Sequence, residues 1–221
     1  MRIIIMGPPG AGKGTEAEVL IKHFQIPHIS TGNIFRELYR KETEVGKIAK
    51  EFISRGELVP DDITNAIVKK RLSEKDAIEK GFLFDGYPRN IEQAKALDEI
   101  LIEKGWTLDA VINITAPDET IIKRIAGRRV CETCGAVYHI EHKKPKVDGI
   151  CDVDGGKLIH RSDDQEKTVQ NRLSIYHEQT KPIIGYYKET TQILFQIDGT
   201  GTMENTHASV MKVLGESSDS N

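Results

Sequence analysis

The sequence predicts an α/β fold, in which a parallel β-sheet carries helices on both faces. Short apolar runs alternate along the chain with segments in which apolar residues recur every three or four positions, as on one face of a helix. The first apolar run, residues 3–6, leads into a glycine-rich segment and then into a helical pattern. Because ligands bind at the carboxyl ends of the strands in such sheets, the loops after the strands are the expected site.

The elements of the first half follow from these patterns. Residues 13–24 have the apolar spacing of a helix, and Ser30-Thr31 suits the N-cap of a second helix. Residues 43–55 predict a third helix, and Pro60 starts a fourth. Residues 82–84 predict a short buried strand that ends at Asp85.

The second half continues the alternation. Apolar runs and helical spacing predict strands at 111–114 and 193–197, and helices from Asp118 and over 203–214. Residues 162–165 have the spacing of a capping box before a long helix that bends near Pro182. Residues 215–221 are expected to be a frayed tail.

Two segments depart from the alternation and are interpreted as insertions. Residues 128–160 are rich in Gly, Lys, His and Cys and have no helical stripe, so they predict a small inserted domain. Residues 30–59 predict a second, helical insertion.

The composition favours an ordinary globular protein of the cytoplasm. The chain has 221 residues, 38% of them hydrophobic and 29% charged. Its net charge of −3 gives no general attraction to nucleic acid or to anionic lipid. Its apolar runs are too short for a membrane span, and the N-terminus lacks the pattern of a signal peptide.

The segment Gly7 to Thr15 has the G-x-x-x-x-G-K spacing of a phosphate-binding loop. Glycines let backbone amides approach a polyphosphate closely, Lys13 adds a positive charge, and the N-terminus of the following helix favours an anion. Most such loops carry Ser or Thr directly after the lysine as a magnesium ligand. This chain has Gly14 there, and the hydroxyl follows at Thr15.

Arginines and one aspartate stand where phosphoryl transfer would need them. Two anionic groups must be held together in that reaction, so several positive charges are required and little covalent chemistry. The candidates are Arg36, Arg89, Arg124, Arg128, Arg161 and Arg172. Asp85 ends a buried strand, as does the aspartate that organises magnesium and its waters beside many phosphate-binding loops.

The order of motifs resembles the adenylate kinase family in its long-lid form. The motifs are GPPGAGKGT, STGNIFR, LVPD, FDGYPRNIEQ, GRR, VYH, RSDDQEKTVQNR and IDGT, and the resemblance runs from residue 1 to about residue 214. It implies a P-loop nucleotide kinase that converts ATP and AMP to two ADP with Mg²⁺. It also implies a five-stranded parallel core (1–29, 60–126 and 165–221), an AMP-binding flap (30–59) and a lid (127–164).

The resemblance also assigns the site residues. Lys13 would neutralise charge on the transferred phosphoryl group, with Asp85, Arg89, Arg124, Arg128, Arg161 and Arg172 as the other catalytic groups. The ATP side would consist of Gly10, Ala11, Gly12, Lys13, Gly14, Thr15, Arg128, Val137, Tyr138 and Gly201. The AMP side would consist of Thr31, Arg36, Glu57, Leu58, Val59, Gly86, Tyr87, Pro88, Arg89, Gln93, Arg161 and Arg172.

Two residues of the AMP side draw particular notice. The Gln93 side chain carries both a donor and an acceptor, which suits the edge of adenine. Asn33 stands where the family commonly has Asp, and this removes a negative charge beside the acceptor phosphate.

All three cysteines lie within 21 residues, and Cys131, Cys134 and Cys151 are joined by an acidic residue at Asp154. Two pairs at C-x-x-C and C-x-x-D spacing predict a tetrahedral, structural Zn²⁺ site. From the residues alone, His139, His142 and Asp152 are alternative fourth ligands, and unmetallated thiols or a transient disulfide are the alternative to a metal. The resemblance favours Asp154.

Other functions are open on the sequence alone. A switch GTPase would need an N-K-x-D motif, and the chain contains no Asn-Lys pair. A zinc-ribbon nucleic-acid binder is disfavoured by the net charge. Within the kinase interpretation, GTP as donor or another monophosphate as acceptor is an alternative. The partners expected are ATP, AMP and ADP, without nucleic acid or membrane, for a monomer.

Overall fold

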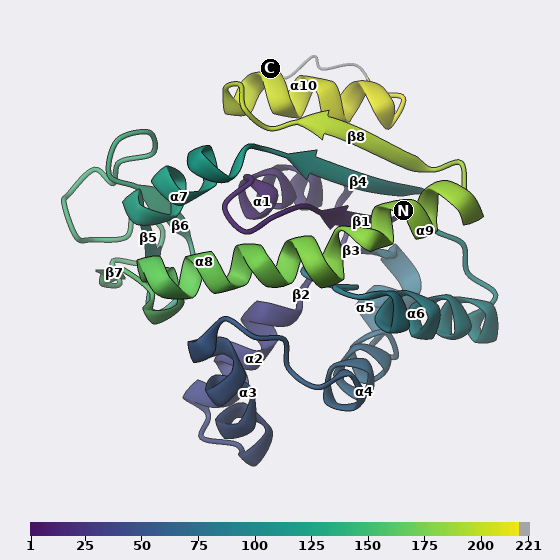
Figure 1. Ribbon diagram of the computed structural model, residues 1–221. Helices are drawn as coiled ribbons and strands as arrows, with labels where there is room; N and C mark the ends of the chain where they lie inside the picture. The colour runs from purple at the N-terminus through teal and green to yellow at the C-terminus, as the bar shows by residue number, and fades with distance from the viewer. Residues whose placement is uncertain (217–221) are drawn as a thin grey trace.

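The computed structural model describes residues 1–216, and a five-stranded sheet with parallel neighbours forms its centre (Figure 1). Residues 217–221, the end of the predicted tail and core segment, lie outside the described part. The strands are β1 (Arg2–Met6), β2 (His28–Ser30), β3 (Phe82–Asp85), β4 (Ala110–Thr115) and β8 (Leu194–Asp198). Their order is β2-β3-β1-β4-β8, so the predicted five-stranded parallel sheet is confirmed.

Helices bury both faces of this sheet. Successive strand residues point to opposite faces, so Ile3 and Ile5 pack against α1 (Lys13–Phe24) and α10 (Met203–Val213). Ile4 and Met6 belong to the opposite cluster, which the remaining core helices cover. Those helices are α4 (Asp61–Arg71), α5 (Lys75–Lys80), α6 (Ile91–Lys104) and α9 (Pro182–Thr190). Burial of each such isoleucine contributes roughly 1.5–3 kcal/mol, which is why the buried positions of the strands are mostly apolar.

The strand order determines where the site lies. β1 is paired with β3 on one side and β4 on the other, with Ile5 opposite both Asp85 and Ile112. The loops that leave the carboxyl ends of β1 and β3 therefore begin side by side. One is the glycine-rich segment, and the other contains Asp85 to Arg89.

The flap segment, residues 30–59, is a pair of helices, α2 (Thr31–Arg40) and α3 (Glu44–Arg55), that project from the sheet (Figure 1). The Thr43 side chain caps α3 by accepting a hydrogen bond from the Gly46 N–H, and Gly56 ends the helix with a φ of 77°. Gly46 packs so closely on α2 that a Cβ there would lie 2.3 Å from backbone atoms of Leu38 and Tyr39.

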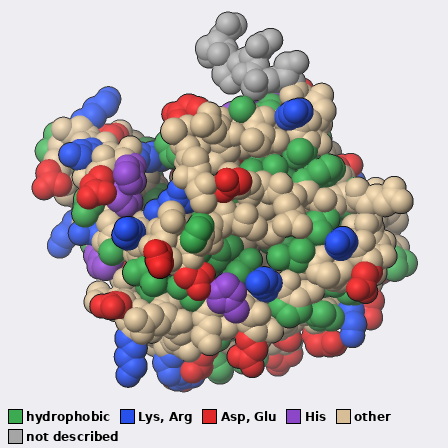
Figure 2. All heavy atoms as spheres, turned by 45° about the horizontal axis from the view of Figure 1, so that its top comes forward, with side chains coloured by type: hydrophobic (Ala, Val, Ile, Leu, Met, Phe, Trp, Pro, Cys, Tyr) green, Lys and Arg blue, Asp and Glu red, His purple; other side chains and the backbone are tan. Residues whose placement is uncertain are grey.

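The lid segment, residues 127–164, follows α7 (Asp118–Gly127) and forms a small antiparallel sheet. Its strands are β5 (Arg128–Cys131), β6 (Val137–His139) and β7 (Leu158–Ile159), in the order β6-β5-β7. The lid segment makes the lobe at the left of Figure 2, where basic, acidic and histidine side chains lie interspersed. Its fully buried cluster consists of Cys131, Tyr138, Cys151 and Leu158.

The chain returns from the lid through a 3₁₀ turn at Ser162–Asp164, and α8 begins at Glu166 and ends at Ile175. The predicted capping box at residues 162–165 is therefore wrong, because the helix starts later and has no side-chain cap. The predicted bend is a π-helical turn, Tyr176–Thr180, which ends two residues before Pro182, and this proline lacks the N–H that would continue the helix.

The other predicted elements agree with the structure to within a few residues. Ser30 occupies the N-cap of α2 but makes no side-chain cap bond, and the Thr31 hydroxyl donates instead to the Gly86 carbonyl (2.8 Å). The sequence patterns did not predict β2, α5 or the three lid strands, which are short. Among residues 1–216, no helix is both long and apolar enough to cross a membrane.

Candidate functional site

The glycine-rich segment between β1 and α1 has a backbone that side chains would not permit. Gly7, Gly10 and Gly12 have φ values of 138°, 81° and 100°. A Cβ on Gly7 would lie 2.1 Å from the Ile114 carbonyl oxygen. Gly12 is the N-cap of α1 and makes no side-chain cap bond, so the helix N-terminus is open to an anion from outside the loop.

Lys13 turns back onto this loop. Its ammonium donates to the carbonyls of Gly7 (2.8 Å) and Pro8 (2.7 Å). Burial lowers the pKa of Lys13 to about 8, although Asp85 opposes the shift. Repulsion from Arg89, Arg172 and Arg128 contributes to the same lowering of the Lys13 pKa. Asp85 balances only part of the positive charge around Lys13, so a further negative group beside Lys13 would be stabilised.

Asp85 lies at the end of β3, beside the loop. Burial would raise its pKa, but His28 and Lys13 outweigh that effect and the pKa lies below its ordinary value. The His28 Nε2 atom lies 3.7 Å from the Asp85 carboxylate. Asp85 is therefore charged at neutral pH, and it can hold a hard cation or the waters bound to one.

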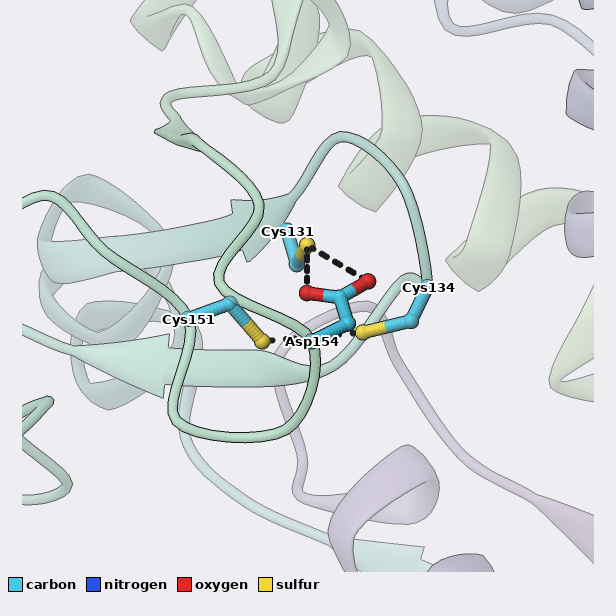
Figure 3. Close-up of side chains that lie close together, drawn as sticks. All are labelled: Cys131, Cys134, Cys151 and Asp154. Carbon is cyan, nitrogen blue, oxygen red and sulfur yellow. Dashed lines mark hydrogen bonds between the residues drawn. The ribbon is translucent and has the colours of Figure 1, made fainter.

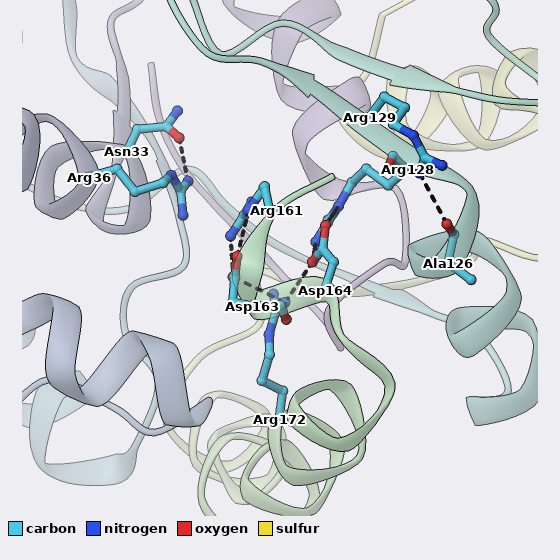
Figure 4. A network of polar contacts seen from close by, with 9 residues as sticks. All are labelled: Asn33, Arg36, Ala126, Arg128, Arg129, Arg161, Asp163, Asp164 and Arg172. Carbon is cyan, nitrogen blue, oxygen red and sulfur yellow. Dashed lines mark hydrogen bonds and ion pairs between the residues drawn. The ribbon is translucent and has the colours of Figure 1, made fainter. Parts of the chain in front are cut away.

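Three arginines from different elements are held by two neighbouring carboxylates (Figure 4). Arg128 of β5 makes a bidentate ion pair with Asp164, and Arg161 makes a bidentate ion pair with Asp163. Arg172 of α8 joins the two pairs: it donates to the Asp163 carbonyl (2.8 Å) and to the Asp164 carboxylate (3.0 Å).

The carboxylates in this network are almost inaccessible to solvent, since the Asp163 and Asp164 side chains are 8% and 0% exposed. Burial would raise the pKa of Asp163, but Arg161 and Arg172 outweigh it and lower the pKa. Burial lowers the pKa of Arg172 to about 10, so its guanidinium is charged at neutral pH. The network fixes three guanidinium groups that would otherwise repel one another.

Arg36 and Arg89 approach the same region from the flap and from the loop after β3. Arg36 donates to the Asn33 side-chain oxygen (2.6 Å), and Arg89 donates through Nε to the Gly86 carbonyl (2.8 Å). Burial, followed by the nearby Arg161, lowers the pKa of Arg36 to about 9. Because Asn33 is neutral, it orients Arg36 without cancelling its charge.

One cavity runs between the core, the flap and the lid, and most of the predicted residues line it. Those on its wall include Gly10, Ala11, Gly12, Lys13, Gly14, Thr15, Arg36, Leu58, Asp85, Gly86, Pro88, Arg89, Arg124, Arg128, Val137, Tyr138, Arg161, Arg172 and Gly201. A side pocket is lined by Thr31, Arg36, Glu57, Leu58, Val59, Gly86, Arg89, Gln93, Arg161 and Arg172.

Tyr87 does not line either cavity. It is 1% exposed, and its hydroxyl donates to the Asn65 side chain (2.8 Å) and lies 3.1 Å from the Gln93 carbonyl. Tyr87 therefore supports the wall from behind. The Tyr138 hydroxyl is also turned from the cavity, toward the Cys151 sulfur (3.4 Å).

The flap and the lid touch across the cavity. Arg40, at the end of α2, donates to the carbonyls of Glu132 and Thr133, both at 3.0 Å. On the other side, Lys143 of the lid lies 3.4 Å from the Glu18 carboxylate of α1. The two insertions therefore cover the cavity.

The predicted metal ligands converge within the lid (Figure 3). The ligand atoms of Cys131, Cys134, Cys151 and Asp154 all lie within 4.8 Å of one another. The sulfurs of Cys134 and Cys151 are 3.6 Å apart, and Cys131 Sγ lies 3.3 Å from an Asp154 oxygen. A tetrahedral zinc with bonds of about 2.3 Å to sulfur separates two sulfurs by about 3.8 Å, so the four ligands fit that ion.

The surroundings of these four residues also suit a metal centre. The Val153 N–H points at the Cys151 sulfur (3.4 Å), and the Gly156 N–H donates to Asp154 (2.9 Å). The latter bond helps to hold the pKa of Asp154 at about 2. The three alternative fourth ligands lie outside the cluster: Asp152 accepts from the Lys146 N–H, and His139 stacks on His142.

Sequence reasoning gave no site role to Asp163, Asp164 or Asp61. Asp163 and Asp164 stand beside Arg161 in the R-S-D-D motif, and their adjacency to an arginine was an available signal. Asp61 belongs to the L-V-P-D motif and contacts Asn90 and Gln93. Its partners lie about 30 residues away along the chain, so only the fold brings them together.

Comparison with known proteins gives one consistent result. Residues 5–192 match the protein family described as adenylate kinase. The chain is 53% identical over 214 residues to the adenylate kinase of Staphylococcus aureus strain Mu50, covering 97% of this chain and 99% of the relative. It is 52% identical, with the same coverage, to the adenylate kinase of Staphylococcus epidermidis.

Replacement of Asp164 by alanine tests the arginine network. Removal of one partner of a buried ion pair leaves the other charge uncompensated, and here two guanidinium groups lose a partner. We expect Asp164→Ala to lower the free energy of unfolding in urea by about 3–5 kcal/mol. Glu37→Ala, which breaks the exposed pair with Lys41, should leave the unfolding midpoint nearly unchanged. Equal effects of the two substitutions would contradict this view of the network.

Proposed function

The chain belongs to the adenylate kinase family, and on that premise we propose which of its residues perform the family's reaction. That reaction is the reversible transfer of a phosphoryl group from ATP to AMP, which yields two ADP. The bond from the terminal phosphorus to the ADP oxygen breaks, and a bond to an AMP phosphate oxygen forms. The AMP phosphate is already an anionic nucleophile, so no general base is required.

ATP is assigned to the glycine-rich loop and the lid. The backbone amides of residues 10–15 and the open N-terminus of α1 would hold its phosphates, with Lys13 moving from the Gly7 and Pro8 carbonyls to a phosphate oxygen. Arg124, Arg128 and the chain near Val137, Tyr138 and Gly201 would complete the ATP side.

AMP is assigned to the side pocket between the flap and the loop after β3. Arg36 and Arg89 would hold its phosphate, and Gln93 would face the base. Thr31, the backbone of Glu57, Leu58 and Val59, and Gly86 would complete the wall of this pocket. Pro88 lines the main cavity, and the buried Tyr87 would support the turn from behind.

Arg161 and Arg172 line both the main cavity and the side pocket, and they would stabilise charge on the transferred group. Their guanidinium groups are already fixed by Asp163 and Asp164, so little reorganisation is needed during the reaction. Mg²⁺ bound with ATP would add further neutralisation of the phosphates, and Asp85 is the residue placed to hold it or its waters. The contact from Arg40 to the lid would help to exclude water, which would otherwise accept the phosphoryl group.

The observation that carries these assignments is the convergence of Lys13 and four arginines from separate elements on one cavity. Arg36 comes from the flap, Arg128 and Arg161 from the lid, and Arg172 from α8. A GTPase switch is not favoured by the comparisons. The donor preference for ATP over GTP, the monomeric state and the cytoplasmic location stay predictions of the sequence.

A coupled assay for ADP tests the assignment of Lys13. ADP formation should require both ATP and AMP, and Lys13→Met should lower kcat by about 10²–10³-fold, because a group aimed at transition-state charge is lost. Lys188→Met on the exposed side of α9 is the control and should retain activity. If Lys13→Met kept more than a tenth of the activity, its assigned role would be wrong.

We further propose that Cys131, Cys134, Cys151 and Asp154 hold a structural Zn²⁺ that stabilises the lid. The buried cluster of the lid is small, and metal binding can supply the missing folding energy. The ion would lie away from the phosphates and take no part in the transfer.

Metal analysis and melting of the same sample test this proposal. The purified protein should contain one zinc per chain, and a strong chelator should lower its Tm by several degrees and speed amide hydrogen exchange in residues 128–159. Cys134→Ser should lose the metal and no longer respond to the chelator. Metal-free wild-type protein with unchanged melting and exchange would refute the zinc proposal.

A further inference from the structure

Asp61 is the first residue of α4, and its carboxylate contacts the side chains of two residues at the start of α6. It accepts a hydrogen bond from Gln93 Nε2 (2.7 Å) and two from Asn90 Nδ2 (2.9 and 3.1 Å). Asn90 in turn is the N-cap of α6, where its oxygen accepts from the Gln93 N–H (2.8 Å). These three side chains form one polar network behind the side pocket.

The network leaves the Gln93 carboxamide a single orientation. Its oxygen accepts from the Arg89 backbone N–H (2.8 Å), which can only donate, and its nitrogen donates to a carboxylate, which can only accept. Gln93 is 2% exposed, so solvent cannot replace a lost partner. If the amide flipped, its NH2 group would face the Arg89 N–H and its oxygen would face the Asp61 carboxylate, so neither side would form a hydrogen bond.

A fixed amide presents a fixed pattern to a ligand. Within the described residues, the Gln93 side chain makes only these two hydrogen bonds, so one N–H and one oxygen lone pair remain for the side pocket that it lines. Adenine offers an amino donor at position 6 beside a ring-nitrogen acceptor. Hypoxanthine and guanine have an oxygen acceptor at position 6 beside an N–H donor, which is the reverse pattern.

We propose that Asp61, together with the Arg89 backbone N–H, sets the base specificity of the monophosphate site by holding the Gln93 amide in the orientation that accepts adenine and rejects 6-oxopurines. The proposal rests on the proposed function, in which Gln93 faces the base of AMP. Asp61 does not itself touch the nucleotide, so it is a positioning residue. A base with the reversed donor and acceptor pattern leaves buried polar groups of the site without hydrogen-bond partners, so the site rejects that base strongly.

The test compares AMP with IMP as phosphoryl acceptors, since IMP keeps the size of AMP and reverses only the pattern at this edge. We expect Asp61→Ala to reduce the ratio of kcat/KM for AMP to that for IMP by at least tenfold, mainly through KM. Asp61→Leu keeps the branched shape of the side chain but offers no acceptor to Gln93 Nε2. It should therefore lower the same ratio by at least threefold, even if Asp61→Ala does not fold.

Asp62→Ala is the matched control, because Asp62 is the next residue of α4, is exposed and shares the charge effect of the helix N-terminus. It should leave the ratio unchanged. A merely structural role of Asp61 would change activity with AMP and IMP alike and leave the ratio constant, and that result would overturn the proposal.

Gln93→Leu distinguishes failure of the Asp61 proposal from failure of the assignment on which it rests, namely that Gln93 faces the base of AMP. If Gln93→Leu removes the preference for AMP but both Asp61 variants retain it, the role of Asp61 is wrong and the assignment of Gln93 stands. If Gln93→Leu also retains the preference, Gln93 does not face the base and both fail. Absence of AMP phosphorylation in the wild-type protein would instead refute the proposed function.

Discussion

The structure depends on the confinement of like charges in a single cavity. Lys13, Arg36, Arg89, Arg128, Arg161 and Arg172 line it, and the carboxylates that face them are Asp85, Asp163 and Asp164. Positive charge therefore exceeds negative charge in this set, and burial works against the charged forms of Lys13 and Arg36, whose pKa values are lowered. A polyphosphate would supply the missing negative charge. The charges are carried by the core, the flap and the lid, so an anion in the cavity would also hold these parts together.

Two devices keep this arrangement in place. Asp163 and Asp164 hold three arginines in fixed positions. Both aspartates lie in the short 3₁₀ turn that joins the lid to α8. The Arg40 contact joins the flap to the backbone of the Cys131–Cys134 loop. A metal at the cysteines would thus stiffen the same loop that the flap meets when the cavity is covered. At the side pocket, Asp61 holds the Gln93 side chain in a similar way, through a hydrogen bond from Gln93 Nε2.

The sequence was sufficient for the parts of the fold that depend on local pattern. The run before Gly7, the helical spacing after Lys13 and the apolar strand before Asp85 predicted β1, α1 and β3 and placed the site at their ends. Short elements failed, because three residues at β2 or two at β7 carry too little periodicity. The capping box failed because Ser162 lies in a 3₁₀ turn that the ion pairs of Asp163 and Asp164 hold in place, and Arg128, a partner of Asp164, is 36 residues away in the sequence. The orientation of Gln93 was likewise out of reach, since Asp61 lies 32 residues from it.

Proton uptake on binding of MgATP tests the central claim most directly. Burial among cations holds the pKa of Lys13 at about 8, so in the empty site the amine loses its proton as the pH rises through that value. Bound phosphates favour the ammonium and raise this pKa, so binding at pH 8 should take up about half a proton. Titration calorimetry at pH 8 in two buffers of different ionisation enthalpy measures the uptake, with Lys13→Met as the reference that lacks it. Binding of MgATP with the same proton balance in both proteins would contradict the account, as would failure of the wild-type protein to bind.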